Sequence, residues 1–160
     1  MPLYLVRHAK AGSRHDFDGD DRERPLTNSG RKQAAALAER LSGASPTVIV
    51  SSPYLRCVET VEPLAVAMGV HVQTNDHLAE FDHLASKNVL SSLRGLLQRL
   101  PDRAVVCSHG DVIPALVESL ANEGMRIDGS PEWGKASVWV LDRNDEDFVS
   151  ARAWPPPVVD

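Results

Sequence analysis

Leu3-Tyr4-Leu5-Val6-Arg7-His8-Ala9-Lys10 is an apolar run near the amino terminus that ends abruptly in a cation and an imidazole. A short apolar run of this kind is typical of a strand buried on both faces of a parallel sheet. Such a strand carries the side chains at its carboxyl end to one edge of the sheet, where a buried charge needs a partner or a ligand. Taken alone, the pair Arg7 and His8 is also compatible with a solvated strand end.

Two further apolar runs end in the same kinds of residue. Ala104-Val105-Val106-Cys107-Ser108 leads into His109, and Thr47-Val48-Ile49-Val50 leads into a helix start that carries Arg56. In open α/β sheets, ligands bind in a crevice outside the carboxyl ends of the strands. Because the pattern recurs, we favour one shared site over unrelated solvated strand ends.

Segments with helical periodicity alternate with these strands, which indicates an α/β fold. Capping residues and apolar spacing predict helices that begin after Thr27, at Ser52 and Pro53, at Ser86, and after Asp111. Further strands are expected at residues 70–74, 136–141 and 148–153. We find no linker or repeat, so residues 1–160 are predicted to form a single domain.

The composition is that of an ordinary globular protein, with 42% hydrophobic and 24% charged residues among 160. A chain of this length can bury an adequate core without metal or disulfide support. With 17 basic against 22 acidic side chains, the net charge is −5. No global field therefore draws the protein to a nucleic acid polymer or an acidic membrane surface, and any anion site must be local.

Neither a signal peptide nor a membrane-spanning segment is recognisable, which favours a cytoplasmic location. In a reducing compartment, Cys57 and Cys107 are expected to remain separate thiols. We assign neither of them a catalytic role.

Residues 11–26 are polar and rich in aspartate and arginine, and Pro25 prevents a helix through them. The spacing from Asp16 invites comparison with a calcium loop. That comparison fails, because Asp21 stands where the loop needs glycine and Thr27 stands where it needs glutamate. We therefore predict a solvated loop beside the site.

A site that combines imidazoles and guanidiniums, without a thiolate or a glycine-rich lysine loop, suits a tetrahedral dianion such as phosphate. An imidazole that donates its Nδ1 proton to a backbone carbonyl presents a free Nε2 lone pair as nucleophile. Phosphoryl transfer then requires in-line placement, charge stabilisation and a proton for the leaving oxygen. A carboxylic acid with a raised pKa can supply that proton.

Five motifs, in order along the chain, together resemble the histidine phosphatase superfamily, in particular its small SixA-type phosphohistidine phosphatase branch. They are Val6-Arg7-His8-Ala9-Lys10, Pro25-Leu26-Thr27-Asn28-Ser29-Gly30-Arg31-Lys32-Gln33-Ala34, Ser51-Ser52-Pro53-Tyr54-Leu55-Arg56-Cys57, Leu78-Ala79-Glu80 and Ser108-His109-Gly110. This resemblance implies a three-layer α/β/α sandwich with a mostly parallel central sheet.

The resemblance also implies roles for individual residues. His8 would be phosphorylated in turnover, with Arg7, Arg56 and His109 as the phosphate clamp, and Glu80 would donate the proton. No metal or other cofactor is expected.

Two further residues are candidates for substrate binding, and two positions depart from the family pattern. The candidates are Arg14, in the polar loop, and Ser137, near a later strand. Ala9 replaces the glycine that usually follows the nucleophile, which narrows the backbone freedom there. Small members of the family vary in the acid, so three carboxylates could replace Glu80 in that role: Asp18, Asp20 and Asp82.

A second, narrower resemblance is to the carboxyl-terminal phosphatase half of actinobacterial Nudix-type nucleotide hydrolases. It rests on Arg7-His8-Ala9-Lys10-Ala11-Gly12, Gly19-Asp20-Asp21, Cys57 with Thr60-Val61-Glu62-Pro63-Leu64-Ala65, Val112-Ile113-Pro114 and Lys135-Ala136-Ser137-Val138-Trp139-Val140-Leu141. This chain carries no Nudix half. The resemblance keeps nucleotides among the possible substrates.

The sequence leaves three functions open. The favoured one is a metal-independent phosphatase that acts on a phosphorylated protein or a small phosphorylated substrate. A metallophosphatase and a non-catalytic phosphate-binding module are the alternatives, although no metal-ligand spacing supports the former. Residues 70–85 are too few to supply both an edge strand and a helical lid, which favours an open site and a bulky partner such as protein phosphohistidine.

Overall fold

The structure is a computed structural model that describes residues 2–79, 86–145 and 147–159. Its strands are β1 (Pro2–Arg7), β2 (Ile49–Ser51), β3 (Val72–Thr74), β4 (Val105–Ser108), β5 (Arg126–Asp128), β6 (Val138–Asn144) and β7 (Asp147–Trp154). Its helices are α1 (Asn28–Ser42), α2 (Leu55–Met68), α3 (Ser86–Arg99) and α4 (Val112–Asn122), with short 3₁₀ helices η1 (Asp21–Glu23) and η2 (Asp76–Leu78). Glu80 and Asp82, two of the candidate acids, lie outside the described residues.

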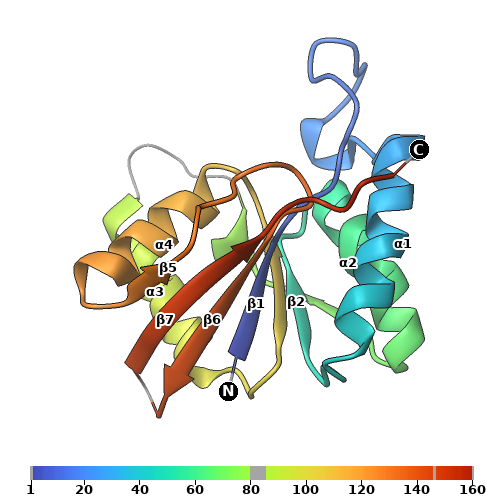
Figure 1. The fold of residues 1–160 in the computed structure, drawn as a ribbon. Helices are drawn as coiled ribbons and strands as arrows, with labels where there is room; N and C mark the ends of the chain where they lie inside the picture. Colours follow the sequence, from blue (N-terminus) through green and yellow to red (C-terminus); the bar gives the residue numbers. More distant parts are fainter. Residues whose placement is uncertain (1, 80–85, 146, 160) are drawn as a thin grey trace.

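The strands form one seven-stranded sheet in the order β3-β2-β4-β1-β6-β7-β5 (Figure 1). Strand β6 runs antiparallel to both of its neighbours, and the other pairs are parallel. The first strand therefore lies at the centre of the sheet, next to β4. A mostly parallel sheet confirms the fold class predicted from the sequence.

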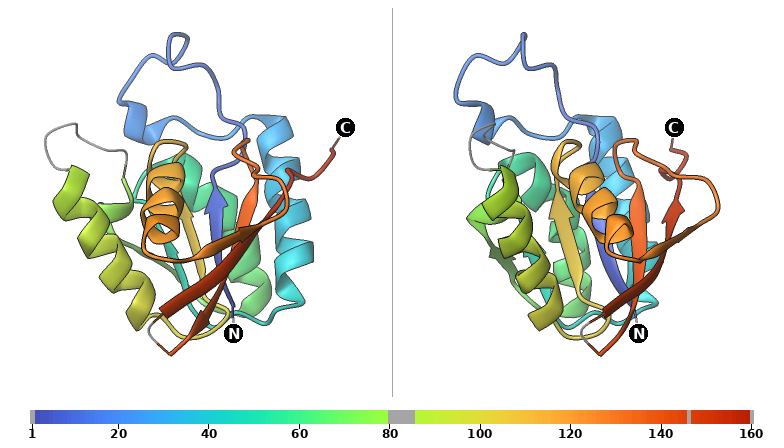
Figure 2. Two further views of the ribbon diagram at one scale, coloured as in Figure 1. Left: turned by 60° about the vertical axis from the view of Figure 1, so that its left-hand side comes forward. Right: turned by 90° about the vertical axis from the view of Figure 1, so that its left-hand side faces the viewer.

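Helices cover both faces of this sheet, with α1 and α2 on one face and α3 and α4 on the other (Figures 1 and 2). Successive side chains of β1 point to opposite faces, so that Leu3 and Leu5 join the core under α3 and α4. Tyr4 and Val6 join the core under α1 and α2. Burial on both faces explains why the sequence of this strand is a continuous apolar run. The sheet and the two layers of helices form a three-layer sandwich.

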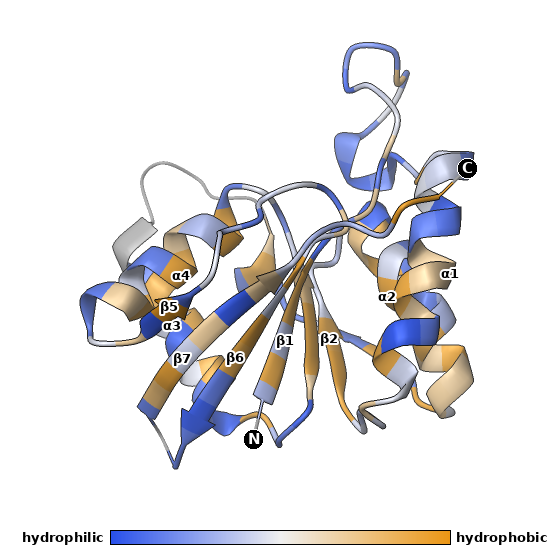
Figure 3. Cartoon of the chain, viewed as in Figure 1, coloured by the Kyte–Doolittle hydropathy of each residue, from blue (hydrophilic) through white to orange (hydrophobic). Residues whose placement is uncertain are grey.

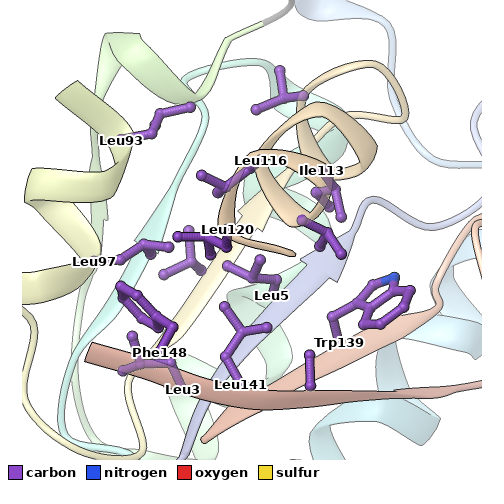
Figure 4. Packing of buried hydrophobic residues seen from close by; sticks show 14 of the residues in the cluster. Leu3, Leu5, Leu93, Leu97, Ile113, Leu116, Leu120, Trp139, Leu141 and Phe148 are labelled. Carbon is purple, nitrogen blue, oxygen red and sulfur yellow. The ribbon is translucent and has the colours of Figure 1, made fainter. Parts of the chain in front are cut away.

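Tight packing holds the α4 side of the sheet. Leu5 and Leu141 from the sheet meet Leu116 and Leu120 from α4 in one cluster of buried residues (Figure 4). Figure 3 shows the same distribution along the chain, with hydrophobic central strands and a hydrophilic loop above them. The strand ends that carry the candidate site residues are therefore attached to a packed core.

The hydrophilic loop comprises residues 11–26 and projects beyond the carboxyl ends of the strands in every view (Figures 1 and 2). A single antiparallel bridge between Ala11 and Leu26 closes its base. Asp20 caps η1 by accepting a hydrogen bond from the Arg22 amide at 3.0 Å. The predicted loop is thus present, and one short 3₁₀ turn is its regular element.

Several predicted boundaries need correction. Thr27 caps α1 as predicted, but α2 begins at Leu55 with Tyr54 as its N-cap instead of at Ser52. The backbone at Tyr54 is still extended, with ψ of 136°, so the helix cannot begin at Pro53. The Ser52 hydroxyl accepts a hydrogen bond from the Tyr54 amide at 3.3 Å and also lies 2.8 Å from His109 Nε2. Asp111 occupies the N-cap of α4 as predicted, without a capping hydrogen bond from its side chain.

The second half of the sheet also differs from the prediction. Strand β6 begins at Val138 and not at residue 136, because Ala136 adopts a left-handed conformation with φ of 68°. Strand β5 was not predicted, since its three residues are all exposed and lack an apolar run. The cysteines are free thiols, as predicted. In the part of the chain that the structure describes, no helix is both long and apolar enough to cross a membrane.

Candidate active site

Register places the two candidate histidines side by side. Strands β1 and β4 are parallel neighbours in which Arg7 pairs with Ser108, so His8 and His109 leave the sheet at the same level. The His8 amide donates to the Ser108 carbonyl at 3.0 Å, and the two imidazole centroids are 5.5 Å apart. Parallel pairing therefore brings together two histidines that are far apart in the sequence.

The tautomer of His8 follows from its backbone contact. Its Nδ1 lies 2.8 Å from the Ala9 carbonyl oxygen, which can only accept, so Nδ1 carries the proton. Burial lowers the pKa of His8 to about 4; the hydrogen bond to Ala9 opposes this shift, and the charges of Arg56 and Arg7 reinforce it. At neutral pH the ring is therefore uncharged, and its Nε2 carries a lone pair.

Thr60 holds the peptide on which this tautomer depends, and its role was not predicted from the sequence. The Ala9 amide donates to Thr60 Oγ1 at 2.9 Å, and the same hydroxyl donates to the Arg56 carbonyl at 2.7 Å. The sequence offered one signal for this role: Thr60 follows Arg56 by four residues, which is about one helical turn. Ala9 is fully buried and its φ is not positive, so this backbone does not require the usual glycine.

The Arg7 guanidinium lies against a residue that has no side chain. A Cβ placed on Gly110 would come within 2.6 Å of Arg7 Cζ, closer than any real contact. Arg7 Nη1 donates to the Trp133 carbonyl at 2.6 Å, whereas the buried Nε finds no acceptor among the described residues. Burial lowers the pKa of Arg7, against an opposing effect of Asp111. An unsatisfied buried donor beside His8 is what an anion site requires.

Arg56 comes from the first turn of α2 and is 1% exposed. Its Nη1 donates to the Asp21 carbonyl at 2.9 Å, and its Nη2 lies 3.3 Å from the Asp21 carboxylate. Its guanidinium also lies 4.8 Å from the centroid of the Tyr54 ring. The polar loop therefore reaches the candidate site through Asp21.

Asp21 was not among the loop carboxylates singled out from the sequence. It is shared by Arg56, Arg24 at 2.9 Å and Arg14 at 3.6 Å. Burial acts to raise the pKa of Asp21, but the Arg24 hydrogen bond and the nearby arginine charges outweigh it, and the pKa is lowered. Asp21 is therefore ionised and cannot serve as a proton donor at neutral pH.

His109 is 1% exposed and lies next to His8 in the site. Its Nε2 lies 2.8 Å from Ser52 Oγ and 3.6 Å from Cys57 Sγ. Burial lowers the pKa of His109 to about 2, with further contributions from the charges of His8, Arg56 and Arg7 that outweigh the effect of Asp21. His109 is therefore a neutral hydrogen-bonding group.

The remaining candidates lie outside this cluster. The Arg14 side chain is 61% exposed, and its Nε lies 3.6 Å from the Asp21 carboxylate. Ser137 is buried, and its carbonyl accepts a hydrogen bond from the Arg7 amide at 3.0 Å. Glu80 lies outside the described residues, but the segment before it is attached to the site, because Ser108 Oγ donates to the Leu78 carbonyl at 2.6 Å.

The arrangement thus defines a class of site: a neutral imidazole with a free Nε2 lone pair, beside buried guanidiniums at the carboxyl ends of parallel strands. Residues 3–88 match the family model for the histidine phosphatase superfamily (branch 1). The chain belongs to this superfamily, which confirms the resemblance seen in the sequence.

Curated relatives extend the comparison along the chain. A protein of Mycolicibacterium smegmatis named 8-oxo-(d)GTP phosphatase is 34% identical over 97% of this chain and 48% of its own length. A probable phosphoglycerate mutase GpmB of Proteus mirabilis is 36% identical over 51% of this chain and 39% of its own length. The chain spans about half the length of the curated relatives it matches, or less.

Solved structures share the fold. The protein histidine phosphatase SixA complexed with tungstate superposes with a TM-score of 0.70 at 20% identity and covers 93% of both chains. A mycobacterial glucosyl-3-phosphoglycerate phosphatase complexed with VO3 has a TM-score of 0.70 at 22% identity and covers 98% of this chain and 99% of its own. At these identities the likeness establishes the fold alone.

Proposed function

We propose that this chain is a metal-independent phosphatase that works through a phosphohistidine on His8. The observation that carries the proposal is the hydrogen bond from His8 Nδ1 to the Ala9 carbonyl in a buried ring whose pKa is lowered to about 4. This contact leaves Nε2 as an uncharged nucleophile at neutral pH. Arg7 Nε, buried and without an acceptor among the described residues, supplies a donor for the anion that the nucleophile attacks.

The proposed reaction has two displacements at phosphorus. In the first, the His8 Nε2 lone pair forms the N–P bond as the bond to the leaving oxygen breaks, and an acid gives that oxygen a proton. In the second, water attacks phosphorus, the N–P bond breaks, and its electron pair returns to Nε2 while the same acid, now a base, takes the proton from water. Arg7 and Arg56 neutralise the phosphoryl oxygens throughout, and neutral His109 hydrogen-bonds to them.

Glu80 remains the proposed acid. Its support is the hydrogen bond between Leu78 and Ser108, the last residue of the strand that leads into His109. In the sequence, Glu80 follows Leu78 by two residues.

Four aspartates compete with Glu80 for the role of acid. Asp21 is the weakest of them, because it is ionised and paired with arginines. Asp18 and Asp20 lie in the polar loop, and Asp82 lies outside the described residues. Exchange of each carboxylate for its amide would rank the five residues by loss of kcat.

The charge around the imidazoles supports a mechanism without metal. Arg56 and Arg7 both lower the pKa of His8 and of His109, and Asp21 opposes them at His109 without outweighing them. A divalent cation placed between those rings would be repelled by the same guanidiniums. We therefore expect activity in the presence of a chelator.

Two substrate classes fit this site. A protein phosphohistidine is favoured because the described part of residues 70–85 forms only β3 and η2, which leaves no described helix as a lid. A phosphorylated nucleotide is the second candidate. It is favoured by the relative named 8-oxo-(d)GTP phosphatase, which is 34% identical over 97% of this chain.

The test is to trap the intermediate. Enzyme quenched during turnover of a ³²P-labelled substrate should carry acid-labile, base-stable phosphate, whereas His8→Ala should carry none and should lose kcat by a factor on the order of 10⁴ or more. His71→Ala, which removes an exposed imidazole before β3, is the matched control and should retain the label. Equal labelling of the His8→Ala variant would overturn the assignment, and binding of phosphate without turnover would show a binding module instead.

A further inference from the structure

Lys135 lies at the candidate site in a turn that is attached to the end of β1. The Ala136 amide lies 3.1 Å from both the Arg7 and the His8 carbonyl oxygens, and the Arg7 amide donates to the Ser137 carbonyl at 3.0 Å. The Ser137 amide in turn donates to the Gly134 carbonyl at 3.0 Å. Lys135 is therefore flanked on both sides by residues whose backbone is held in place.

The same turn holds a strained backbone. Ala136 has a φ of 68°, a left-handed conformation that costs a non-glycine residue energy and persists only where the surroundings impose it. Arg7 reaches the turn from the other side, through its hydrogen bond to the Trp133 carbonyl. Trp133 itself packs on buried Trp139, with ring centroids 4.9 Å apart. Strain of this kind, next to a reactive group, is typical of segments that position a functional side chain.

The charge of Lys135 has no described counterpart. Lys135 is exposed and makes no hydrogen bond or ion pair with any residue in the described ranges. Partial burial is the main cause that lowers the pKa of Lys135. The positive charges of its neighbours lower this pKa further; they are Arg7, Arg24, Lys10 and Arg56. The Ala136 amide, next to Lys135, lies 3.1 Å from the His8 carbonyl oxygen, and the charge of Lys135 is accordingly the smallest of those that lower the pKa of His8.

A single phosphate dianion does not account for this charge. Five positive charges gather here: Lys135 and the four cations that act on it, which are Arg7, Arg24, Lys10 and Arg56. Two carboxylates oppose them, Asp21, which pairs with Arg24 and Arg56, and Asp111, which acts on Arg7. With the two charges of a phosphate dianion added, one positive charge is still unmatched. In a protein whose net charge is −5, an exposed lysine held among other cations indicates an anionic ligand larger than one phosphate.

We propose that Lys135 is a specificity residue that binds a second phosphate of the substrate, carried by the leaving group next to the phosphoryl group transferred to His8. The proposal rests on the proposed function and, of its two substrate classes, favours small compounds with more than one phosphate over a protein phosphohistidine. Such compounds include nucleoside diphosphates, in which the phosphates are joined, and sugar bisphosphates, in which a carbon chain separates them.

The experiment compares substrates that differ in one phosphate. Steady-state kinetics are measured with a nucleoside monophosphate, the diphosphate of the same base and a hexose bisphosphate. For Lys135→Gln we expect kcat/KM for substrates with a second phosphate to fall about tenfold, with less than a twofold change for the monophosphate, because a charge-assisted contact is lost only with the former. Lys135→Arg should restore most of the loss, and a loss confined to the nucleoside diphosphate or to the bisphosphate identifies which spacing the site binds.

A matched control and a binding measurement complete the test. Lys32→Gln removes the same charge from the exposed face of α1 and should leave all substrates unaffected. Calorimetry with inorganic pyrophosphate and orthophosphate reads the second-phosphate contact without turnover, and Lys135→Gln should abolish any preference for pyrophosphate. Equal loss on all substrates, or no loss on any, would overturn the proposal. A wild-type protein that is inactive with every substrate but prefers pyrophosphate through Lys135 would refute the proposed phosphatase and not the second-phosphate contact.

Discussion

Two regions meet at the candidate site, and they are built differently. The strand-end cluster, made of Arg7, His8, Arg56 and His109, follows directly from strands or from a helix start, and His8, Arg56 and His109 are at most 6% exposed. The polar loop, residues 11–26, is mostly exposed and joins the cluster through Asp21, whose backbone carbonyl and carboxylate both contact Arg56. Groups held by sheet register cannot shift without breaking the core, whereas a loop held by an ion pair can.

The largest difference between the two regions should appear when a charge is removed from the strand-end cluster. Arg56→Ala should lower kcat by a factor of about 10² to 10³, because a preorganised donor to developing negative charge is worth on the order of 3 kcal/mol. Because Arg56 is 1% exposed and binds Asp21, its loss should also lower the melting temperature. The control is Arg31→Ala, which removes an exposed arginine of α1 and should leave kcat unchanged. A loss of kcat below tenfold would remove Arg56 from the catalytic machinery.

The next largest difference should appear when one methyl group is added to a glycine in each region. Gly110→Ala would place a Cβ within 2.6 Å of Arg7 Cζ, so the guanidinium must move. The neighbour that moves is the end of a flexible side chain, so folding should change little while kcat/KM falls about 10- to 100-fold through misplacement. Gly12→Ala in the polar loop, where a Cβ has nothing within 4 Å, should be silent. Equal effects of the two variants would show that Arg7 placement is not critical.

Low pH should reduce both activity and stability through the buried imidazoles of the strand-end cluster. Activity requires neutral His8, whose pKa is lowered to about 4, so kcat/KM should be insensitive to His8 between pH 5 and 8 and fall about tenfold per pH unit below that pKa. Stability should respond over a wider range. Between pH 6.5 and 4 the unfolded chain binds protons at His8 and His109 that the folded chain does not bind, so the free energy of unfolding falls as pH is lowered.

Melting temperatures and pH–rate profiles measured across pH 3.5 to 8 check both parts of this prediction. His8→Asn should flatten part of the dependence of the melting temperature, because one of the two titrating imidazoles is gone. An acid limb of kcat/KM near pH 6.5 would contradict the buried, neutral state of His8.

The smallest effect is expected in the polar loop. Asp21→Asn keeps the shape of the side chain and removes its charge, and a partly exposed ion pair contributes up to about 1 kcal/mol. We therefore expect kcat/KM to change less than about fivefold, with faster amide hydrogen exchange across residues 11–26. If Asp21→Asn costs as much as Arg56→Ala, the loop is part of the catalytic framework and the distinction between the two regions fails.

Much of the fold could be predicted because its determinants are local. The continuous apolar run that ends at Arg7 indicated a central strand, and Thr27 caps its helix as expected. Strand β5 could not be predicted, since its exposed residues are ordered by pairing with β7 and not by an apolar pattern. Ser52 was wrongly predicted as the N-cap because the chain stays extended as far as Tyr54, while the Ser52 hydroxyl lies against His109, which is distant in the sequence.

The candidate site divides in the same way. The sequence by itself determined which imidazoles and guanidiniums stand at strand and helix ends, because strand ends and motifs are local patterns. Tertiary structure alone decided that Thr60 anchors Ala9, that Asp21 reaches Arg56 and that the turn carrying Lys135 is bound to the backbone of His8. Each of these contacts joins segments distant along the chain, and their distance and direction depend on register and packing. No periodicity in the sequence records those quantities.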